Sequence, residues 1–204
     1  MAIAPGTTLA DQFIPARISR TSNLVKDGML VIGGSALLAL CSQVIIPLPF
    51  TPIPLTLQTF VVLLIGATLG GKRGLLTSLL YLLEGVAGLP VFAAGASGLA
   101  HLTGPSAGYL WAMPIVAYVV GILCERGMDR KYSTAVIAML IGTIIVYICG
   151  VSWLSIFTHS SLYVAFLEGM VPFIPGDLIK IIVAVALLPT TWRIVRQIKS
   201  TSAN

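Results

Sequence analysis

The sequence has few charged residues, few histidines and few cysteines. Only 9% of its 204 residues are Asp, Glu, Lys or Arg, whereas 57% are hydrophobic, and the mean hydropathy is +0.99. A soluble domain carries about 25% charged residues, so this composition excludes a water-soluble globular protein. We therefore expect an integral membrane protein, and the length suits one compact bundle of a few spans.

The scarce cysteines and histidines form no pattern that binds a metal or a redox cofactor. Cys41, Cys124 and Cys149 are widely separated inside apolar runs, which is typical of small buried side chains. His101 and His159 have no second histidine or carboxylate at the spacing of metal ligands. We expect neither a metal site nor a cofactor.

The net charge of +5 does not indicate nucleic-acid binding. The basic residues lie beside apolar segments, where they suit the anionic headgroups of membrane lipids. No basic stripe interleaved with exposed aromatic residues is present. Membrane lipids, rather than nucleic acid, are therefore the expected surroundings of these charges.

Six apolar segments approach the ~20 residues that a transmembrane helix requires. They are residues 29–48, 55–70, 74–88, 108–124, 133–158 and 173–192. The second and third segments are short, so each is expected to tilt little or to have one end inside the bundle. The sequence thus predicts an all-α integral membrane protein in which six transmembrane helices, at 29–192, lie between tails at 1–28 and 193–204.

The distribution of Lys and Arg predicts the topology. Eleven of the twelve basic residues lie on one side of the predicted membrane: Arg17, Arg20, Lys26, Lys72, Arg73, Arg126, Arg130, Lys131, Arg193, Arg196 and Lys199. The connections on the other side, at 47–54, 89–107 and 159–172, contain none. By the positive-inside rule both termini are expected in the cytosol of a multi-pass protein of the cell membrane.

The connection 89–107 is apolar enough to resemble a further span. Pro90, Pro105 and three glycines would break a helix there, and a crossing would also reverse the charge pattern of the later loops. We expect a long ordered outer loop between the third and fourth helices. Long uncharged loops of this kind often act as lids.

Two charged residues, Asp177 and Lys180, lie inside the last apolar segment, "VPFIPGDLIKIIVAVALLP". A spacing of three places them about 60° apart on one helix face, within reach of each other. The pair forms either a ligand site or a structural ion pair. A cation near a helix N-terminus opposes the helix dipole, so Lys180 favours the ligand site.

Other polar residues leave more than one interpretation open. Glu84 and Tyr81 share a face of the third segment, where the carboxylate either lines the same cavity or reaches the interface. Gln58 offers its amide either to a ligand or to a neighbouring helix. Ser35 and Ala39 form a small-xxx-small pair on the first segment, which allows close approach of another helix.

Four motifs together resemble the BioY family, the biotin-binding S components of energy-coupling factor transporters. They are "PIPLTLQTF" (52–60), "GLPVFAAGASG" (88–98), "GPSAGYL" (104–110) and "PFIPGDLIK" (172–180), in the family's order. The resemblance covers residues 30 to 190. It implies a six-helix membrane protein that binds biotin near its outer face and works with a T component and two ABC-type ATPases.

The resemblance also implies roles for particular residues. Asp177 and Lys180 match the Asp and Lys of the family's ligand pocket, and Ser97 stands where the family often has a polar loop residue. Ser35 and Ala39 match the small residues that pack against the T component. Biotin suits such a pocket, since its ureido N–H groups need acceptors and its ureido oxygen or carboxylate suits a cation.

The expected function is therefore biotin uptake by a substrate-binding transporter subunit, without enzymatic activity. The predicted pocket lies beneath the loops 47–54 and 89–107, and its predicted residues are Gln58, Tyr81, Glu84, Phe92, Ser97, Phe173, Asp177 and Lys180. Phe92 and Phe173 are expected to pack against apolar parts of the ligand. Two alternatives remain: an intramembrane enzyme that uses Glu84 or Asp177, and a vitamin transporter that works alone.

Overall fold

The computed structural model describes residues 6–14, 20–49 and 51–201, and the chain there is almost entirely helical. The long helices are α2 (Arg20–Ser42), α3 (Gln58–Leu69), α4 (Gly71–Val86), α5 (Ala107–Glu125), α6 (Tyr132–Thr158) and α8 (Ile174–Thr201). The short ones are α1 (Leu9–Phe13), α7 (Leu162–Gly169), η1 (Ala93–Gly95), η2 (Leu99–Thr103), η3 (Met128–Arg130) and η4 (Val171–Phe173). Arg17 and parts of the predicted tails 1–28 and 193–204 lie outside the described residues.

The all-α prediction is confirmed. Four helical stretches are long and apolar enough to cross a membrane: Thr21–Ser42, Ala107–Glu125, Tyr132–Thr158 and Leu162–Thr201. The helices α3 and α4 coincide with the second and third apolar segments and are shorter, as their sequences indicate. Six helices thus match the six segments, and a crossing by all six remains a prediction.

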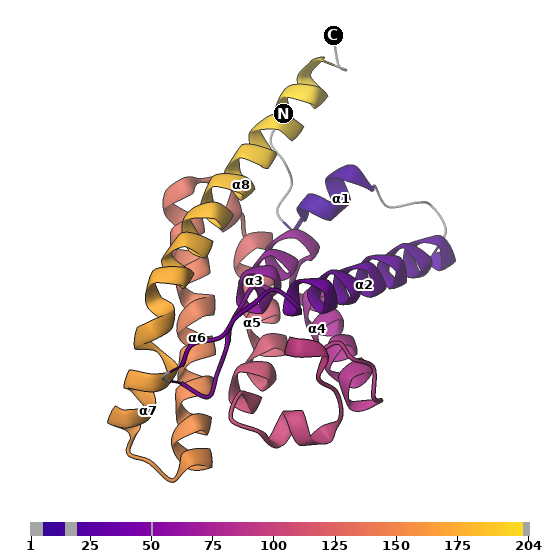
Figure 1. Ribbon diagram of the computed structural model, residues 1–204. Helices are drawn as coiled ribbons and strands as arrows, with labels where there is room; N and C mark the ends of the chain where they lie inside the picture. Colours follow the sequence, from indigo (N-terminus) through magenta and orange to yellow (C-terminus); the bar gives the residue numbers. More distant parts are fainter. Residues whose placement is uncertain (1–5, 15–19, 50, 202–204) are drawn as a thin grey trace.

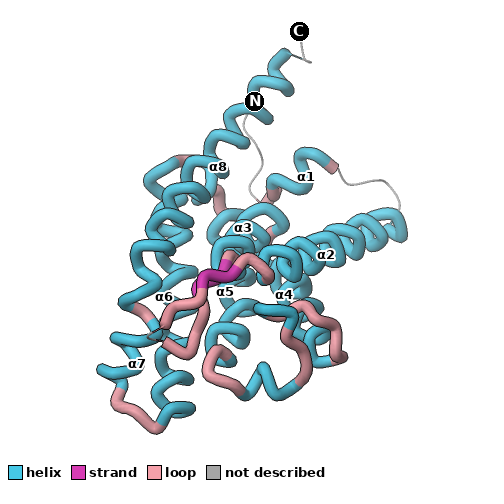
Figure 2. Tube along the Cα trace, viewed as in Figure 1, coloured by secondary structure: helices cyan, strands magenta, loops and turns pink. Residues whose placement is uncertain are grey.

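The first and last helices differ in extent from the predicted segments. The helix α2 begins at Arg20 and ends at Ser42, whereas the apolar segment runs from 29 to 48. Residues 45–46 form strand β1 (Ile45–Ile46), which pairs antiparallel with β2 (Leu55–Thr56). The prolines between the strands cannot continue a helix, so the end of this apolar run becomes a hairpin (Figure 2). The helix α8 continues through residue 201 instead of ending at 192.

The elements are arranged so that two groups of connections lie at opposite ends of the bundle (Figure 1). The helix α1 and the C-terminal part of α8 lie at one end, and the loop with η1 and η2 lies at the other, together with α7. The connection 89–106 contains only these two short 3₁₀-helices and does not return through the bundle. It forms the ordered loop that its prolines and glycines predict.

The helix α5 forms the centre of the bundle, because it packs against α3, α4 and α6. Small residues permit this close packing. A Cβ atom on Gly66 would lie 2.6 Å from the carbonyl oxygen of Ala117, and one on Gly121 would lie 2.3 Å from the amide nitrogen of Gly71. Backbone contact of this kind is the usual means by which membrane helices associate without a hydrophobic driving force.

The helix α2 diverges from the other helices over much of its length (Figure 1). Its contact with the bundle is mainly with α4, and many of its apolar side chains are exposed. Ser35 is fully buried and its Oγ donates a hydrogen bond to Glu84 Oε2, while Ala39 is half-buried against the core. These two small residues therefore pack against the chain's own helices, and the partner surface predicted for them stays a prediction.

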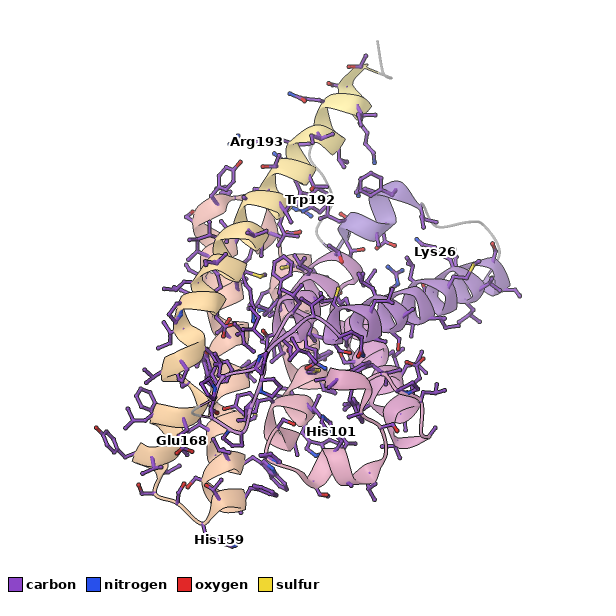
Figure 3. The ribbon with its side chains drawn as sticks, in the orientation of Figure 1. Lys26, His101, His159, Glu168, Trp192 and Arg193 are labelled. Atoms are coloured by element: carbon purple, nitrogen blue, oxygen red, sulfur yellow. The ribbon has the colours of Figure 1, made fainter. Side chains whose placement is uncertain are left out.

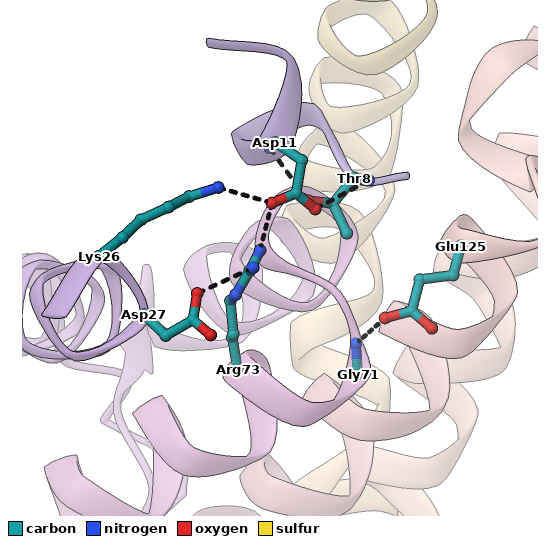
Figure 4. Close-up of polar contacts among 7 residues, drawn as sticks. All are labelled: Thr8, Asp11, Lys26, Asp27, Gly71, Arg73 and Glu125. Carbon is teal, nitrogen blue, oxygen red and sulfur yellow. Dashed lines mark hydrogen bonds and ion pairs between the residues drawn. The ribbon is translucent and has the colours of Figure 1, made fainter. Parts of the chain in front are cut away.

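A polar network joins α1, α2 and α4 (Figure 4). It lies at the end of the bundle opposite the η1–η2 loop (Figure 1). Asp11 accepts hydrogen bonds from Lys26 Nζ at 2.8 Å and Arg73 Nη1 at 2.9 Å, and Arg73 also pairs with Asp27. Burial alone would raise the pKa of Asp11, but the hydrogen bonds from Lys26, Thr8 and Arg73 hold it at about 2. The carboxylate is therefore charged at neutral pH and links the three helices.

Replacing Asp129 by Asn should stabilise the protein at neutral pH. Asp129 is 1% exposed in η3, and it accepts a hydrogen bond from Trp192 Nε1 of α8. Burial raises its pKa from 3.8 to about 6, although Trp192 and Arg130 oppose this shift. Because the folded-state pKa is the higher one, the charged form costs stability above pH 6, and stability rises as the pH falls from 6 towards 3.8.

We expect Asp129→Asn to raise the unfolding temperature at pH 7.5 and to have little effect near pH 4, since an Asn oxygen can still accept from Trp192. Thermal unfolding in detergent at both pH values measures this difference. Glu168→Gln, which changes a half-exposed carboxylate of α7, is the control. A lower unfolding temperature for Asp129→Asn at pH 7.5 would contradict the argument.

Candidate ligand-binding site

A cavity opens among the β1–β2 hairpin, the loop between α4 and α5, the first turns of α3, α5 and α8, and the middle of α6. The residues that line it are Ile53, Pro54, Leu55, Thr56, Gln58, Thr59, Ala93, His101, Ser106, Tyr109, Leu110, Met113, Val146, Tyr147, Phe173, Asp177 and Lys180. Most are apolar or aromatic, and the polar groups converge from several elements. This combination is typical of a site for a small organic molecule.

The charged pair at the start of α8 forms the most polar part of the cavity. Lys180 Nζ donates to Asp177 Oδ1 at 2.8 Å and to Thr59 Oγ1 of α3 at 2.9 Å. Tyr147 of α6 donates its hydroxyl proton to Asp177 Oδ2. Both charged side chains are 11% exposed. An ammonium has three N–H donors, so the described contacts leave Lys180 one donor for a ligand.

Asp177 combines the roles that the sequence leaves open. It lies in the first turn of α8, where the helix dipole stabilises a negative charge. It also holds Lys180 and Tyr147 towards the cavity from two different helices. The pair is therefore structural and pocket-forming at once, and it presents both a cation and acceptor oxygens to the cavity.

A second polar group lies where the β1–β2 hairpin enters α3. Gln58 is 7% exposed and donates from Nε2 to Tyr81 OH at 2.6 Å, while its Oε1 accepts from Thr56 Oγ1 at 3.1 Å. Tyr81 in turn donates to the carbonyl oxygen of Val91 at 3.0 Å. Gln58 lines the cavity, whereas Tyr81 stands behind it and connects α4 with the loop that follows α4.

The loop between α4 and α5 supplies another wall of the cavity through Ala93 and His101. The imidazole of His101 stacks on Phe92, with ring centroids 5.0 Å apart, and Phe92 is fully buried. Burial lowers the pKa of His101 below its usual range, so its ring is neutral at pH 7. Figure 3 shows His101 in the half of the molecule away from Trp192 and Arg193.

The structure brings four of the eight predicted pocket residues into the lining: Gln58, Phe173, Asp177 and Lys180. Tyr81 and Phe92 lie directly behind that lining. Glu84 is not part of it, because its carboxylate bonds to Ser35 on the side of α4 that faces α2. Ser97 is exposed on the loop and is also outside the lining.

Sequence reasoning missed several polar residues of the cavity: Thr59, His101, Ser106, Tyr109 and Tyr147. A tyrosine in an apolar helix needs a hydrogen-bond partner for its hydroxyl, so the sequence could have predicted a polar contact for Tyr147 inside the bundle. Thr59 adjoins Gln58 and could have been included with it. The sequence positions of Tyr147 and Thr59 do not indicate which helix each side chain faces.

The donor set suits an organic ligand rather than a metal ion. Within residues 6–14, 20–49 and 51–201, no group of three His, Cys, Asp or Glu side chains is placed to hold a metal. The cavity instead offers an ammonium group, carboxylate oxygens, an amide and two phenol groups around apolar walls.

Comparisons with known proteins agree on one family. The family model described as "BioY family" matches residues 14–197. The chain is 41% identical over 136 residues to "Probable biotin transporter BioY" of Pyrococcus horikoshii, covering 67% of this chain and 78% of that protein. It is 39% identical over 139 residues to "Biotin transporter BioY" of Thermotoga maritima, covering 68% and 80%.

A solved structure shares the fold as well as part of the sequence. It is the crystal structure of "the S-component for biotin from an ECF-type ABC transporter", with a TM-score of 0.75 and 28% identity. The match covers 90% of this chain and 95% of the other.

Proposed function

The chain belongs to the BioY family, and from this membership and the pocket's geometry we propose that it binds biotin between the Asp177–Lys180 pair and the outer loops. Its function is biotin uptake, as the S component of an ECF-type transporter. It is a transport protein and not an enzyme, since its relatives are named biotin transporters. This replaces the alternative of an intramembrane enzyme that uses Glu84 or Asp177.

One observation carries the proposed site: a nearly buried ion pair whose groups point into a cavity with apolar walls. Placing two charges there costs several kcal/mol, even when they are paired, which a purely structural role would not require. Biotin has the matching chemistry. Its ureido N–H groups can donate to carboxylate or amide oxygens, its ureido oxygen or carboxylate can accept from Lys180, and its sulfur ring and chain suit the apolar walls.

The rest of the transport cycle forms part of the same proposal. The pocket faces the outside, six helices cross the cell membrane, both termini lie in the cytosol, and lipids surround the bundle. Binding requires no cofactor. A T component and two ABC-type ATPases supply the energy, since the solved relative is named as a component of an ECF-type ABC transporter.

Equilibrium binding of radiolabelled biotin to the purified protein tests the proposed site. We expect saturable binding of one biotin per chain that excess unlabelled biotin displaces. Absence of saturable binding by folded protein would refute the biotin site.

Uptake into proteoliposomes tests the energy source. The chain alone should bind biotin without accumulating it, and addition of a T component with its ATPases should produce ATP-dependent accumulation. Accumulation by the chain alone would instead favour the transporter that works by itself.

A further inference from the structure

Gln43 is the first residue after α2, and its side-chain amide holds the turn at the start of the outer loop. Its Oε1 accepts a hydrogen bond from the amide of Gly95 at 2.9 Å. Its Nε2 donates to the carbonyl oxygen of Phe92 at 3.0 Å and also lies 2.8 Å from Ser42 Oγ and 3.2 Å from the carbonyl oxygen of Ala39. One side chain therefore bonds to both ends of the 92–95 turn. The neighbouring Ser42 is fully buried and donates to the carbonyl oxygen of Val91.

The turn that Gln43 holds has an unusual backbone. Ala94 has φ of +58° and Gly95 has φ of +68°, so two successive residues adopt the left-handed region. A residue with a Cβ atom rarely adopts this conformation, and such outliers persist where surrounding contacts determine them. The amide of Gln43 provides two of those contacts from the residue that follows α2.

The same turn positions one wall of the cavity. Ala93 lines the cavity, and the buried ring of Phe92 packs edge-on against Tyr81 and stacks on His101, which also lines it. A displacement of residues 91–95 would therefore move Ala93 directly and His101 through the ring stack. Gln43 itself is exposed and lies outside the lining, so it acts on the cavity only through this turn.

We propose that Gln43 is a positioning residue that holds residues 91–95 closed over the pocket and so determines how long biotin stays bound. The proposal rests on the proposed biotin site. The closed turn blocks departure of the ligand, and its opening is opposed by the two hydrogen bonds to the Gln43 amide. Loss of Gln43 consequently increases the rate of dissociation more than it changes the rate of association.

Dissociation of radiolabelled biotin, chased with unlabelled biotin, tests this in three variants of the full chain. For Gln43→Ala we expect a dissociation rate about 10- to 30-fold above wild type, the effect of two lost hydrogen bonds. Gln43→Glu can accept from Gly95 but cannot donate to Phe92, so its rate should fall between the two. Leu40→Ala changes an exposed residue of α2 and should leave the rate unchanged.

Hydrogen exchange of the unliganded protein provides a measurement that does not depend on biotin. Gln43→Ala should accelerate exchange in the peptide that covers residues 91–98 and leave α5 and α6 unaffected. A wild-type rate of exchange there, or a wild-type dissociation rate in Gln43→Ala, would overturn the proposal. If folded wild type fails to bind biotin, the proposed site is wrong, and the exchange data still decide whether Gln43 holds the turn.

Discussion

Replacing Lys180 by Met should weaken biotin binding by about 30-fold to several thousand-fold. Removing one partner of a buried, hydrogen-bonded charge pair costs about 2–5 kcal/mol, and each 1.4 kcal/mol is tenfold in the dissociation constant. Lys180 is 11% exposed and donates to Asp177 and Thr59, with its remaining donor available to the ligand. Equilibrium binding to the purified variant measures the loss.

Two further variants separate the ligand contact from a general loss of structure. Lys199→Met alters the same residue type at the far, exposed end of α8 and should bind biotin normally. Thr59→Val removes one acceptor of Lys180 but leaves the ion pair, so a loss of about tenfold or less is expected. If folded Lys180→Met binds biotin as wild type does, the pair is purely structural and the ligand lies elsewhere.

The same variant can identify the end of biotin that Lys180 meets. Biotinamide has the ureido ring of biotin but no carboxylate. If Lys180 binds the carboxylate, wild type should prefer biotin strongly over biotinamide, and Lys180→Met should abolish the preference. If Lys180 binds the ureido oxygen, both ligands should lose affinity equally in the variant.

The core of the site could be predicted because its two charges are close in sequence. Asp177 and Lys180 are three residues apart, so helix geometry alone brings them together, as the 2.8 Å contact shows. The partners Tyr147 and Thr59 come from other helices. Their rotation about the helix axis depends on the packing of the whole bundle, and the apolar pattern of a membrane helix carries little information about it.

The polar residues Glu84 and Ser35 also show that the sequence alone does not indicate which helix a polar side chain faces. Each is unusual in an apolar segment, and the sequence leaves Glu84 with a pocket role and Ser35 with a partner role. In the structure they bond to each other between α4 and α2. A polar pair within the membrane can therefore satisfy itself, and only the packing of the helices shows that it does.

The ends of helices were predictable where an apolar run changes abruptly to polar residues. They were less predictable where an apolar run contains proline. Each of the six long helices overlaps one of the six segments. The end of α2 does not follow its segment, because Ile45 and Ile46 continue the apolar run but pair as a hairpin with Thr56 and Leu55. Hydropathy measures the preference for an apolar environment and does not distinguish a helix from a hairpin.

Replacing Gly85 by Ala should weaken biotin binding at least tenfold and lower the unfolding temperature. A Cβ atom on Gly85 would lie 2.0 Å from Cζ of Phe92, inside the buried ring. The ring would have to move, and with it the stack on His101 and the adjacent wall of the pocket. Added volume in a packed core costs about 1–3 kcal/mol. Binding and thermal unfolding of the purified variant measure the two effects.

A second glycine and a double variant test whether Phe92 is the cause. Gly33→Ala places a methyl group on α2 where no atom lies within 4 Å, so it should leave binding unchanged. Phe92→Ala removes the ring, and adding Gly85→Ala to it should then cost little. If Gly85→Ala is equally damaging with and without the ring, the clash with Phe92 is not the reason. If the effect of Gly85→Ala depends on the Phe92 ring, the absence of a side chain at residue 85 of α4 is what allows the loop to place that ring behind the pocket wall.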